Sequence, residues 1–408
     1  MKPYWSEKFG NASSLHSFGR EARVAVEQSR AKIALILNCS PEEIIFTGTT
    51  TTSNNLAILG IVGLGKKGKM GDPTSSGSAG LRGARKGNRG HLITTQIEHH
   101  AVLDTFKYLE KPAFAPPNRR ASAGKNFVVT YLPVDKYGVV DLDALEKAIK
   151  PETVLVSIMY ANNEVGTIQP IREIINIVKE KKGKKVEEGE RGDIYVHTDA
   201  AATAEYLDLD VQKLGVDLMT LGSHKFGGPK GIGILYIKKG TKINPITFGG
   251  HHEDGLWPGT EAVPLIVGMT KALDIVQSSK LKVQSEVTKL RDKLIKGVLE
   301  SVEGSILTGH PIKRLPDIAS FIFKGVEGEA VLLRLDAQGI AVSSGSACTS
   351  GDLRPSHVLL AMGIAQEEAH GSIRFSLGRN TTEEEIDYVL EVLPRVIEDI
   401  RKMTPRLI

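Results

Sequence analysis

The chain has few cysteines and few aromatic residues. Of its 408 residues, only Cys39 and Cys348 are cysteines, and 5% are aromatic. Two cysteines cannot form the disulfide framework of a small secreted domain, and neither lies in a CxxC pair or at zinc-ligand spacing from a histidine. The low cysteine content favours a reducing, intracellular setting, and we expect a cytoplasmic protein.

Long apolar runs and a strong excess of one charge are also missing. The longest apolar run, Leu56–Leu64, is far shorter than the roughly 20 residues of a membrane helix. Residues 1–20 lack the apolar core of a signal peptide. The net charge is only +4, which gives no argument for nucleic-acid binding. We therefore expect a soluble protein that binds neither membranes nor nucleic acid directly.

Short apolar segments rich in β-branched residues recur along the first two thirds of the chain, and helical stretches separate them. There are seven: Ile44–Thr47, His91–Thr95, Phe127–Pro133, Thr153–Tyr160, Ile194–Thr198, Leu218–Leu221 and Gly233–Ile237. Nearly continuous apolar strands that alternate with helices are typical of a parallel sheet covered on both faces. The sequence predicts an α/β fold with a mostly parallel, seven-stranded sheet.

The pattern changes near Pro264. The segments that follow are a long charged helix and then alternating strand-like and helical stretches: Val267–Val302, Ala319–Phe323, Gly328–Gln338, Ser372–Ser376 and Thr382–Met403. This order is typical of an α+β unit. We predict a large domain over residues 1–262 and a smaller α+β domain over residues 263–408.

A lysine and an aspartate each follow a predicted strand. Lys225 stands in Ser223-His224-Lys225, just before a glycine-rich turn. Burial at a strand end lowers the pKa of an amine and frees its lone pair, which suits a Schiff base with an aldehyde cofactor; a surface lysine is the alternative. Asp199 ends another strand, where a carboxylate can keep a pyridine nitrogen protonated or simply cap a helix.

Hydroxyl and imidazole groups follow two more strands. Residues Thr49 to Ser53 precede a helix, where hydroxyls and free N–H groups suit a phosphate; a plain helix cap is the alternative. Glu98-His99-His100 offers an imidazole that could stack on a flat cofactor and move protons. No third ligand lies at suitable spacing from the two histidines, so we expect no metal site there.

Two candidates lie in the C-terminal third. Residues Gly339–Arg354 are rich in glycine and serine and include Cys348, whose thiolate would be a strong nucleophile on an exposed loop. Cys39 is expected to pack locally. Arg374 could offer a two-pronged hydrogen-bond donor to a carboxylate, or form a structural ion pair. Together with the phosphate, histidine, aspartate and lysine candidates, these residues predict pyridoxal phosphate (PLP) chemistry on a sulfur-containing amino acid.

Several longer motifs carry a family resemblance over nearly the whole chain. They read ITTQIEHHAVLDT, VLVSIMYANNEVGTIQPI, HTDAA, SHKFGGPKGIG, AVSSGSACTS and SIRFSLGRNTTEEEID. With these motifs the chain resembles the NifS/IscS-type cysteine desulfurases of the class V aminotransferase family. The resemblance implies PLP as cofactor and the PLP-dependent transferase fold type I.

The resemblance also implies a role for each candidate. Lys225 would bind the PLP aldehyde, Asp199 its pyridine nitrogen, and His99 would stack on its ring. The phosphate would be held by Thr50, Thr51, Ser223 and His224, joined by Thr260 from the second subunit of a homodimer. The substrate carboxylate would bind Asn163 and Arg374. At position 222, a glycine stands where relatives commonly carry a phosphate-binding serine, and Ala202 stands where they commonly carry glutamine.

The implied activity is conversion of L-cysteine to L-alanine, with the sulfur left as a persulfide on Cys348. The persulfide would pass to a sulfur acceptor such as an iron–sulfur scaffold protein, or serve tRNA thiolation. No resident metal is implied, although Cys348 is a candidate for a transient iron–sulfur ligand shared with a scaffold partner. Two alternatives remain open: a selenocysteine lyase, and a weakly active or non-catalytic scaffold subunit.

Overall fold

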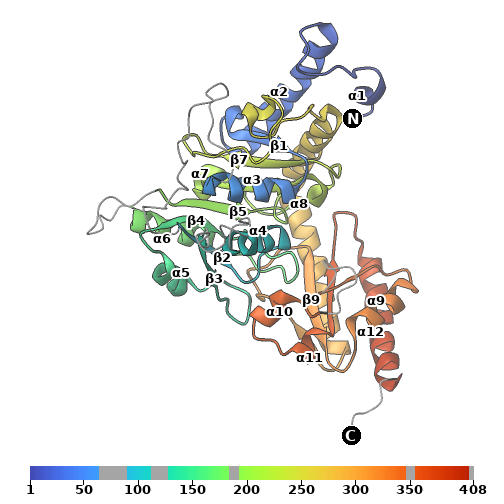
Figure 1. The fold of residues 1–408 in the computed structure, drawn as a ribbon. Coiled ribbons are helices and arrows are strands. Elements are labelled where there is room, and N and C mark those ends of the chain that lie inside the picture. The colour runs from blue at the N-terminus through green and yellow to red at the C-terminus, as the bar shows by residue number, and fades with distance from the viewer. Residues whose placement is uncertain (64–89, 112–126, 183–192, 346–353, 404–408) are drawn as a thin grey trace, which may run out of the picture. The chain divides into compact units, whose positions relative to one another are not determined.

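The computed structural model describes residues 1–63, 90–111, 127–182, 193–345 and 354–403, which form two compact units (Figure 1). The first unit comprises residues 1–132, 142–160 and 170–278. The second comprises residues 133–141, 161–169 and 279–408. Residues 133–141 and 161–169 thus belong to the second unit, although in the sequence they connect strands of the first.

The first unit is built on a seven-stranded sheet. Its strands are β1 (Ile44–Thr47), β2 (Gly90–Thr95), β3 (Phe127–Leu132), β4 (Thr153–Ser157), β5 (Tyr195–Asp199), β6 (Leu218–Gly222) and β7 (Gly233–Ile237). Their order is β1-β7-β6-β5-β4-β2-β3. Only β7 runs against its neighbours β1 and β6, and the other pairs are parallel. The predicted mostly parallel sheet is confirmed.

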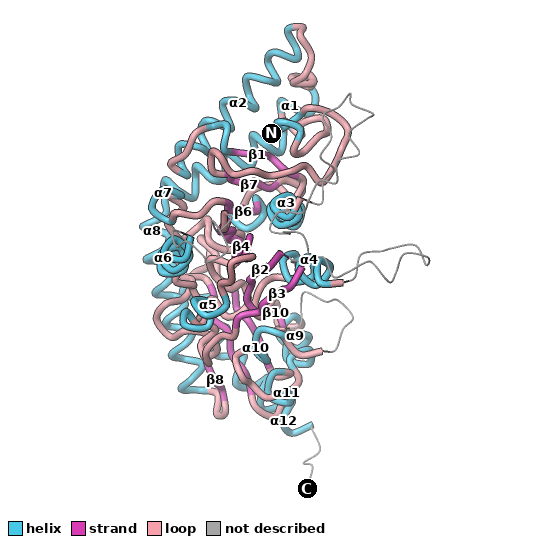
Figure 2. The backbone as a smooth tube through the Cα atoms, turned by 60° about the vertical axis from the view of Figure 1, so that its left-hand side comes forward, coloured by secondary structure: helices cyan, strands magenta, loops and turns pink. Residues whose placement is uncertain are grey.

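Helices cover both faces of this sheet, which explains why its strands are apolar throughout. Figure 2 shows α3 (Thr50–Val62) and α4 (His100–Glu110) on one side of the strands, with α6 (Ile171–Lys182) and α7 (Val211–Leu214) on the other. The unit also contains α1 (Pro3–Ser6), α2 (Ser17–Leu37) and α5 (Leu142–Ala148). Leu56, Phe106 and Leu155 are completely buried in the core between the sheet and α3 and α4.

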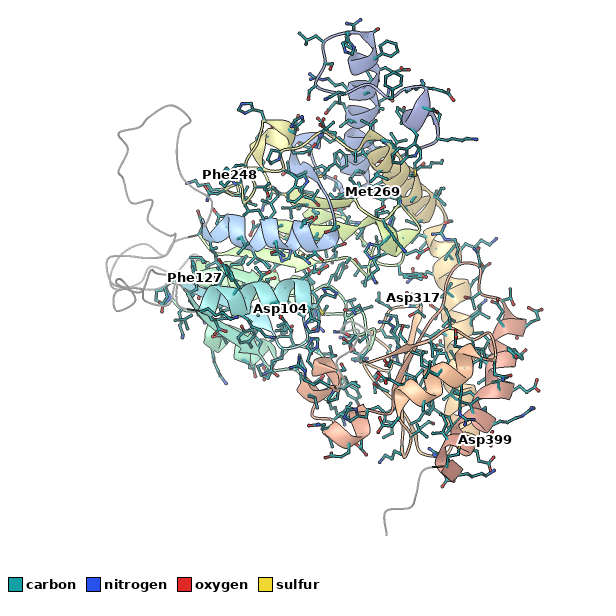
Figure 3. All side chains as sticks on the ribbon, turned by 45° about the vertical axis from the view of Figure 1, so that its right-hand side comes forward. Asp104, Phe127, Phe248, Met269, Asp317 and Asp399 are labelled. Carbon is teal, nitrogen blue, oxygen red and sulfur yellow. The ribbon has the colours of Figure 1, made fainter. Side chains whose placement is uncertain are left out.

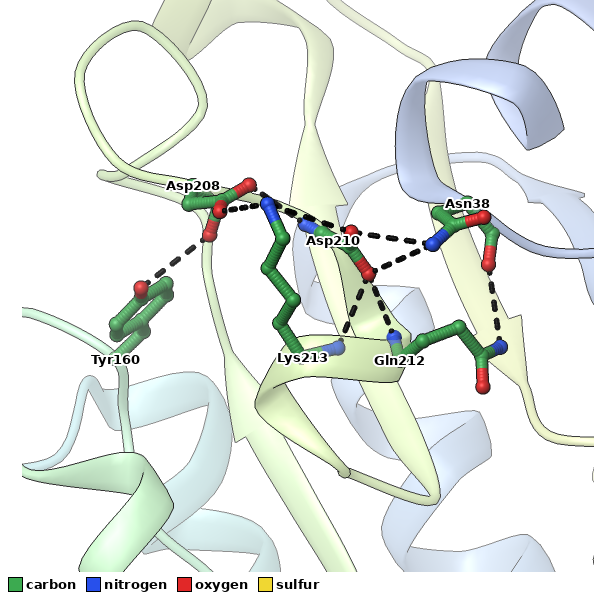
Figure 4. Close-up of polar contacts among 6 residues, drawn as sticks. All are labelled: Asn38, Tyr160, Asp208, Asp210, Gln212 and Lys213. Atoms are coloured by element: carbon green, nitrogen blue, oxygen red, sulfur yellow. Dashed lines mark hydrogen bonds and ion pairs between the residues drawn. The ribbon is translucent and has the colours of Figure 1, made fainter.

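A polar network ties α2 to the connection between β5 and β6 (Figure 4). Asn38 ends α2 in the left-handed conformation, at φ 57°. Its amide Nδ2 donates to both carboxylate oxygens of Asp210, each at 3.1 Å. Asp210 in turn caps α7 by accepting from the backbone N–H groups of Gln212 and Lys213. These hydrogen bonds therefore fix the connection between β5 and β6 at Asp210, just before α7.

The second unit contains an antiparallel sheet in the order β10 (Ser343–Ser344), β11 (Ser372–Ser376), β9 (Ile318–Phe323) and β8 (Ser305–Leu307). Its helices are α9 (Gly328–Asp336), α10 (His357–Ala361), α11 (Gln366–Ala369) and α12 (Glu383–Met403). Phe321, Leu335 and Leu393 are buried in its core. The predicted domain boundary at residues 262 and 263 falls at the start of α8 (Val263–Ser301), a helix that contributes to both units, and it stays a prediction.

Large apolar side chains are exposed near the N-terminus. Phe9 and Phe18 stack with ring centroids 5.7 Å apart, and both are more than half exposed, as is Trp5. Phe248, labelled in Figure 3, is 62% exposed on another loop of the same unit. Exposed aromatic groups in such number are typical of a protein–protein interface. Among the described helices, none is long and apolar enough to cross a membrane.

Candidate cofactor site

The predicted aspartate and lysine leave neighbouring parallel strands at the same edge of the sheet. Asp199 is the last residue of β5, and it pairs with Thr220 of β6. Ser223, His224 and Lys225 follow β6 directly, in one turn of 3-10 helix. The carboxyl ends of parallel strands are where open α/β sheets bind ligands. The fold thus brings these candidates together, as a shared cofactor requires.

Asp199 is buried and held in place by two donors. Its Oδ2 accepts from the amide Nδ2 of Asn54 at 2.6 Å, and its Oδ1 accepts from the backbone N–H of Ala201 at 2.9 Å. Each carboxylate oxygen can accept a second hydrogen bond, so a protonated pyridine nitrogen can still bind. Sequence reasoning missed Asn54; the available signal was an amide just before the apolar part of the helix, which begins at Leu56.

The run of threonines before α3 divides into caps and candidate ligands. Thr49 and Thr52 form a capping box, because each side-chain oxygen accepts from the other residue's backbone N–H. The Thr50 hydroxyl is buried and has no hydrogen-bond partner within the described ranges, and neither has the buried hydroxyl of Ser223. Buried hydroxyls without partners are rare in folded proteins. These two therefore fit an anionic group such as the PLP phosphate.

Thr51 and His99 line one hollow between α3 and α4. Its volume is about 430 Å³, and Asp104, labelled in Figure 3, lies on its α4 side. His99 is half-buried and caps α4, since its Nδ1 accepts from the backbone N–H of Ala101 at 3.1 Å. In a neutral imidazole the proton is then on Nε2. This is the proton that a neutral His99 can donate.

His224 and Lys225 are both exposed in the chain. Of the two positions that the sequence left open for Lys225, the single chain shows the exposed one, because the 3-10 turn carries the residue beyond the end of the sheet. Partial burial of the imidazole nonetheless lowers the pKa of His224, and positive charge on Lys225, Lys230 and His99 lowers it further. These groups thus act on one another electrostatically. Thr260 is also exposed.

Glu98 is a second buried carboxyl group beside Asp199, and sequence reasoning gave it no role. Its Oε1 accepts from the Thr95 hydroxyl at 2.7 Å and from the backbone N–H of Met159 at 2.9 Å. Burial raises the pKa of Glu98 to about 8, and the charge of Asp199 contributes to the increase. Glu98 therefore joins the ends of β2 and β4 as a largely protonated acid near neutral pH.

In the second unit, the predicted pair Asn163 and Arg374 is brought into contact. The Arg374 guanidinium donates to the main-chain oxygen of Asn163 at 2.8 Å and to the Ser343 hydroxyl at 3.1 Å. Its Nε is buried without a hydrogen-bond partner among the described residues. Arg314 holds the same loop through the main-chain oxygen of Val165. The partners of Arg374 that the structure describes are therefore not those of a structural ion pair.

The two cysteines differ in what the structure describes. Cys348 lies outside the described residues. Cys39 is half-buried, and burial, with a smaller contribution from the charge of Glu43, raises the pKa of its thiol to about 12. A thiol with so high a pKa is almost never a thiolate at neutral pH, so Cys39 is a poor nucleophile.

A family model described as Aminotransferase class-V matches residues 1–71 and 78–389. The chain belongs to this family. Class-V relatives include a cysteine desulfurase IscS from Dictyoglomus turgidum, which is 45% identical over 405 residues that span 99% of this chain and 92% of the relative. The predicted resemblance to the NifS/IscS-type enzymes of the class-V family is confirmed.

Solved structures agree with this assignment. A NifS-like protein is 36% identical, with a TM-score of 0.81 over 98% of this chain and 94% of its own. SspA in complex with cysteine is 32% identical, with a TM-score of 0.71 over 93% of this chain and 94% of its own. The predicted PLP-dependent transferase fold type I of the class-V family is confirmed.

Proposed function

We propose that the protein is a PLP-dependent cysteine desulfurase, which converts L-cysteine to L-alanine and leaves the sulfur on Cys348. The relatives named cysteine desulfurase, and the cysteine bound to SspA, support this substrate. The observation that carries the proposal is the pair of buried hydroxyls from Thr50 and Ser223, which find no partner among the described residues. They lie at the sheet edge where Asp199 and Lys225 leave β5 and β6. That edge offers hydroxyls for a phosphate, a carboxylate for a pyridine nitrogen and an amine for an aldehyde.

The residues fit PLP as follows. Lys225 would hold the aldehyde, Asp199 the pyridine nitrogen and His99 the ring face. The phosphate would be held by Thr50, Thr51, Ser223 and His224, with Thr260 from a second subunit. PLP, when bound, withdraws electrons from the substrate amino acid, so that its Cα proton can be removed and its carbon–sulfur bond can break.

The chain's own groups then carry the reaction. Asn163 and Arg374 bind the substrate carboxylate, and the Lys225 amine takes the Cα proton. The Cys348 thiolate attacks the substrate sulfur; the carbon–sulfur bond breaks, its electron pair stays with the substrate carbons and Cβ takes up a proton. Lys225 then returns a proton to Cα. The products are L-alanine and a persulfide on Cys348, so atoms and electrons balance. His99 holds an Nε2 proton beside this chemistry.

The exposed aromatic groups of Trp5, Phe9 and Phe18 support a homodimer, as does the exposed Thr260, which would complete the partner's phosphate site. The acceptor that we propose for the persulfide is an iron–sulfur scaffold protein in the cytoplasm, with tRNA thiolation as a second use. During transfer Cys348 would serve as a transient iron–sulfur ligand.

Two variants test this function. With PLP and a thiol reductant supplied, Cys348→Ser should lose sulfide release from L-cysteine at least 100-fold but keep the visible absorbance of bound PLP. Lys225→Ala should lose both. Sulfide release by Cys348→Ser at the wild-type rate would refute the nucleophile. Faster turnover of L-selenocysteine than of L-cysteine would favour a selenocysteine lyase, and a wild-type protein inactive on both would favour a scaffold subunit.

A further inference from the structure

Gly222 occupies a position where the backbone does not require glycine. It ends β6 at φ −121° and ψ 116°, an extended conformation that any residue adopts. The reason for glycine is steric: a Cβ atom at this position would overlap the Thr50 hydroxyl oxygen and would lie 3.3 Å from the Thr50 Cβ. The missing side chain of residue 222 therefore makes the space in which the Thr50 hydroxyl lies.

A second glycine brings the first turn of α3 to the same place. Gly233 of β7 pairs with Gly222 on one side and with Thr47 on the other. A Cβ atom at Gly233 would lie 2.8 Å from the main-chain carbon of Thr49. The first turn of α3 thus packs against two glycines on neighbouring strands, and Thr50 is the first residue of that turn.

The Thr50 hydroxyl forms no hydrogen bond within the part of the chain that the structure describes. Thr49 and Thr52 cap the helix between themselves, whereas the Thr50 oxygen is buried without a hydrogen-bond partner. Ser223 directly follows Gly222, and its buried hydroxyl also lacks a hydrogen-bond partner among the described residues. Leaving a buried hydroxyl without a hydrogen-bond partner is destabilising, so both hydroxyls fit a ligand that accepts hydrogen bonds.

We propose that Gly222 is a positioning residue for the phosphate of the cofactor: it admits the Thr50 hydroxyl, and a side chain at position 222 excludes that hydroxyl from its place. The hydroxyl that reaches the phosphate is carried by residue 50 in this chain, and a serine at position 222 could carry it only if residue 50 lost its own. This inference rests on the proposed function, because the phosphate is that of PLP.

The test is a swap of the hydroxyl between the two positions, read as the dissociation constant of PLP from spectroscopic titration. Thr50→Val keeps the shape of the side chain and removes the hydroxyl, and it should weaken PLP binding about tenfold. Gly222→Ser alone should weaken binding by more than that, because the new side chain collides with Thr50. The double variant Thr50→Ala/Gly222→Ser should bind within about threefold of wild type, so the second substitution rescues the first.

Pyridoxal, which lacks the phosphate, is the control ligand, and all variants should bind it alike. If Gly222→Ser fails to fold, as judged by thermal unfolding, the double variant must regain both folding and PLP binding. Additive losses in the double variant, or equal losses with pyridoxal, would overturn the inference while the wild-type protein still binds PLP. A wild-type protein that binds no PLP would instead overturn the proposed function.

Discussion

The cofactor site of the first unit and the Arg374 loop of the second unit leave different polar groups open. At the carboxyl ends of β1 and β6, the neutral hydroxyls of Thr50 and Ser223 have no partners in the described ranges. They lie after strands β1 and β6, Thr50 at the start of α3. In the second unit, the buried groups without partners among the described residues include the guanidinium Nε of Arg374. Hydroxyls and helix N-termini suit a phosphate, whereas a guanidinium suits a carboxylate.

We therefore assign recognition of the cofactor phosphate to the first unit and recognition of the substrate carboxylate to the second. The phosphate is a permanent part of the cofactor and can be held by groups that the fold buries. A substrate carboxylate must enter and leave in each turnover. Arg374 donates to Asn163 and Ser343 through its two terminal nitrogens, while its Nε has no partner among the described residues. Substitutions in the two units should therefore separate cofactor binding from substrate binding.

The largest effect is expected at Arg374. Arg374→Lys keeps the charge but loses the forked geometry, so it should raise KM for L-cysteine about 100-fold with a smaller change in kcat and no change in PLP absorbance. Arg291→Lys is the matched control, because Arg291 is another buried guanidinium of the same unit that donates to the main-chain oxygen of Leu315. A loss of PLP from Arg374→Lys would break the comparison between the units.

Glu98 comes next. Its side chain forms a hydrogen bond with a main-chain group, as the side chains of Arg374 and Arg291 do, but it lies in the first unit. Glu98→Ala leaves the Met159 N–H without its acceptor and should destabilise the protein by about 1–3 kcal/mol and weaken PLP binding several-fold. Glu98→Gln keeps an oxygen in place and should bind PLP as the wild type does at neutral pH. Equal losses in both variants would show that Glu98 needs its charge.

The pH dependence of stability gives Glu98 a second readout. Its pKa, about 8 in the folded protein, is above the usual value, so between about pH 5 and 8 the folded state binds more protons than the unfolded state. Stability should then fall as the pH rises through this range, by up to about 1.4 kcal/mol per pH unit from this group. Urea unfolding of Glu98→Gln should lack that contribution.

The smallest effect is expected at Asp210, which lies on the connection between β5 and β6. Asp210→Ala removes the cap of α7 and the contact with Asn38, and should destabilise the protein by about 1 kcal/mol. PLP binding and KM should not change. Asp210→Asn is the control, because asparagine also caps helices well. Weaker PLP binding in Asp210→Ala would mean that the cofactor site depends on this distant network.

Most of the sheet could be predicted from sequence, because each strand is a short apolar segment with clear ends. That strands β5 and β6 would bring Asp199 and Lys225 together followed from the parallel arrangement. The reversed direction of β7 could not be predicted, since the composition of a strand does not encode its direction. Nor could the division of the threonine run into caps and unpartnered hydroxyls, which depends on which oxygen reaches which N–H.

The environment of single groups was the least predictable part. The exposure of Lys225 depends on a turn that the strand pattern does not reveal, and the proton on Glu98 depends on burial beside Asp199. Both are properties of packing between elements far apart in the chain. The steric exclusion between Gly222 and Thr50 belongs to the same class.

The pairing of β1 with β7 has a consequence for how the protein is made. Ile44 lies opposite Tyr236, and β7 is the single sheet neighbour of β1 among the described strands. While a ribosome is still translating the codons between these residues, the first turn of α3 has no strand to rest on. With the proposed function, we therefore expect a nascent chain to bind PLP only after β7 has left the exit tunnel, so that cofactor loading is a late event in its synthesis.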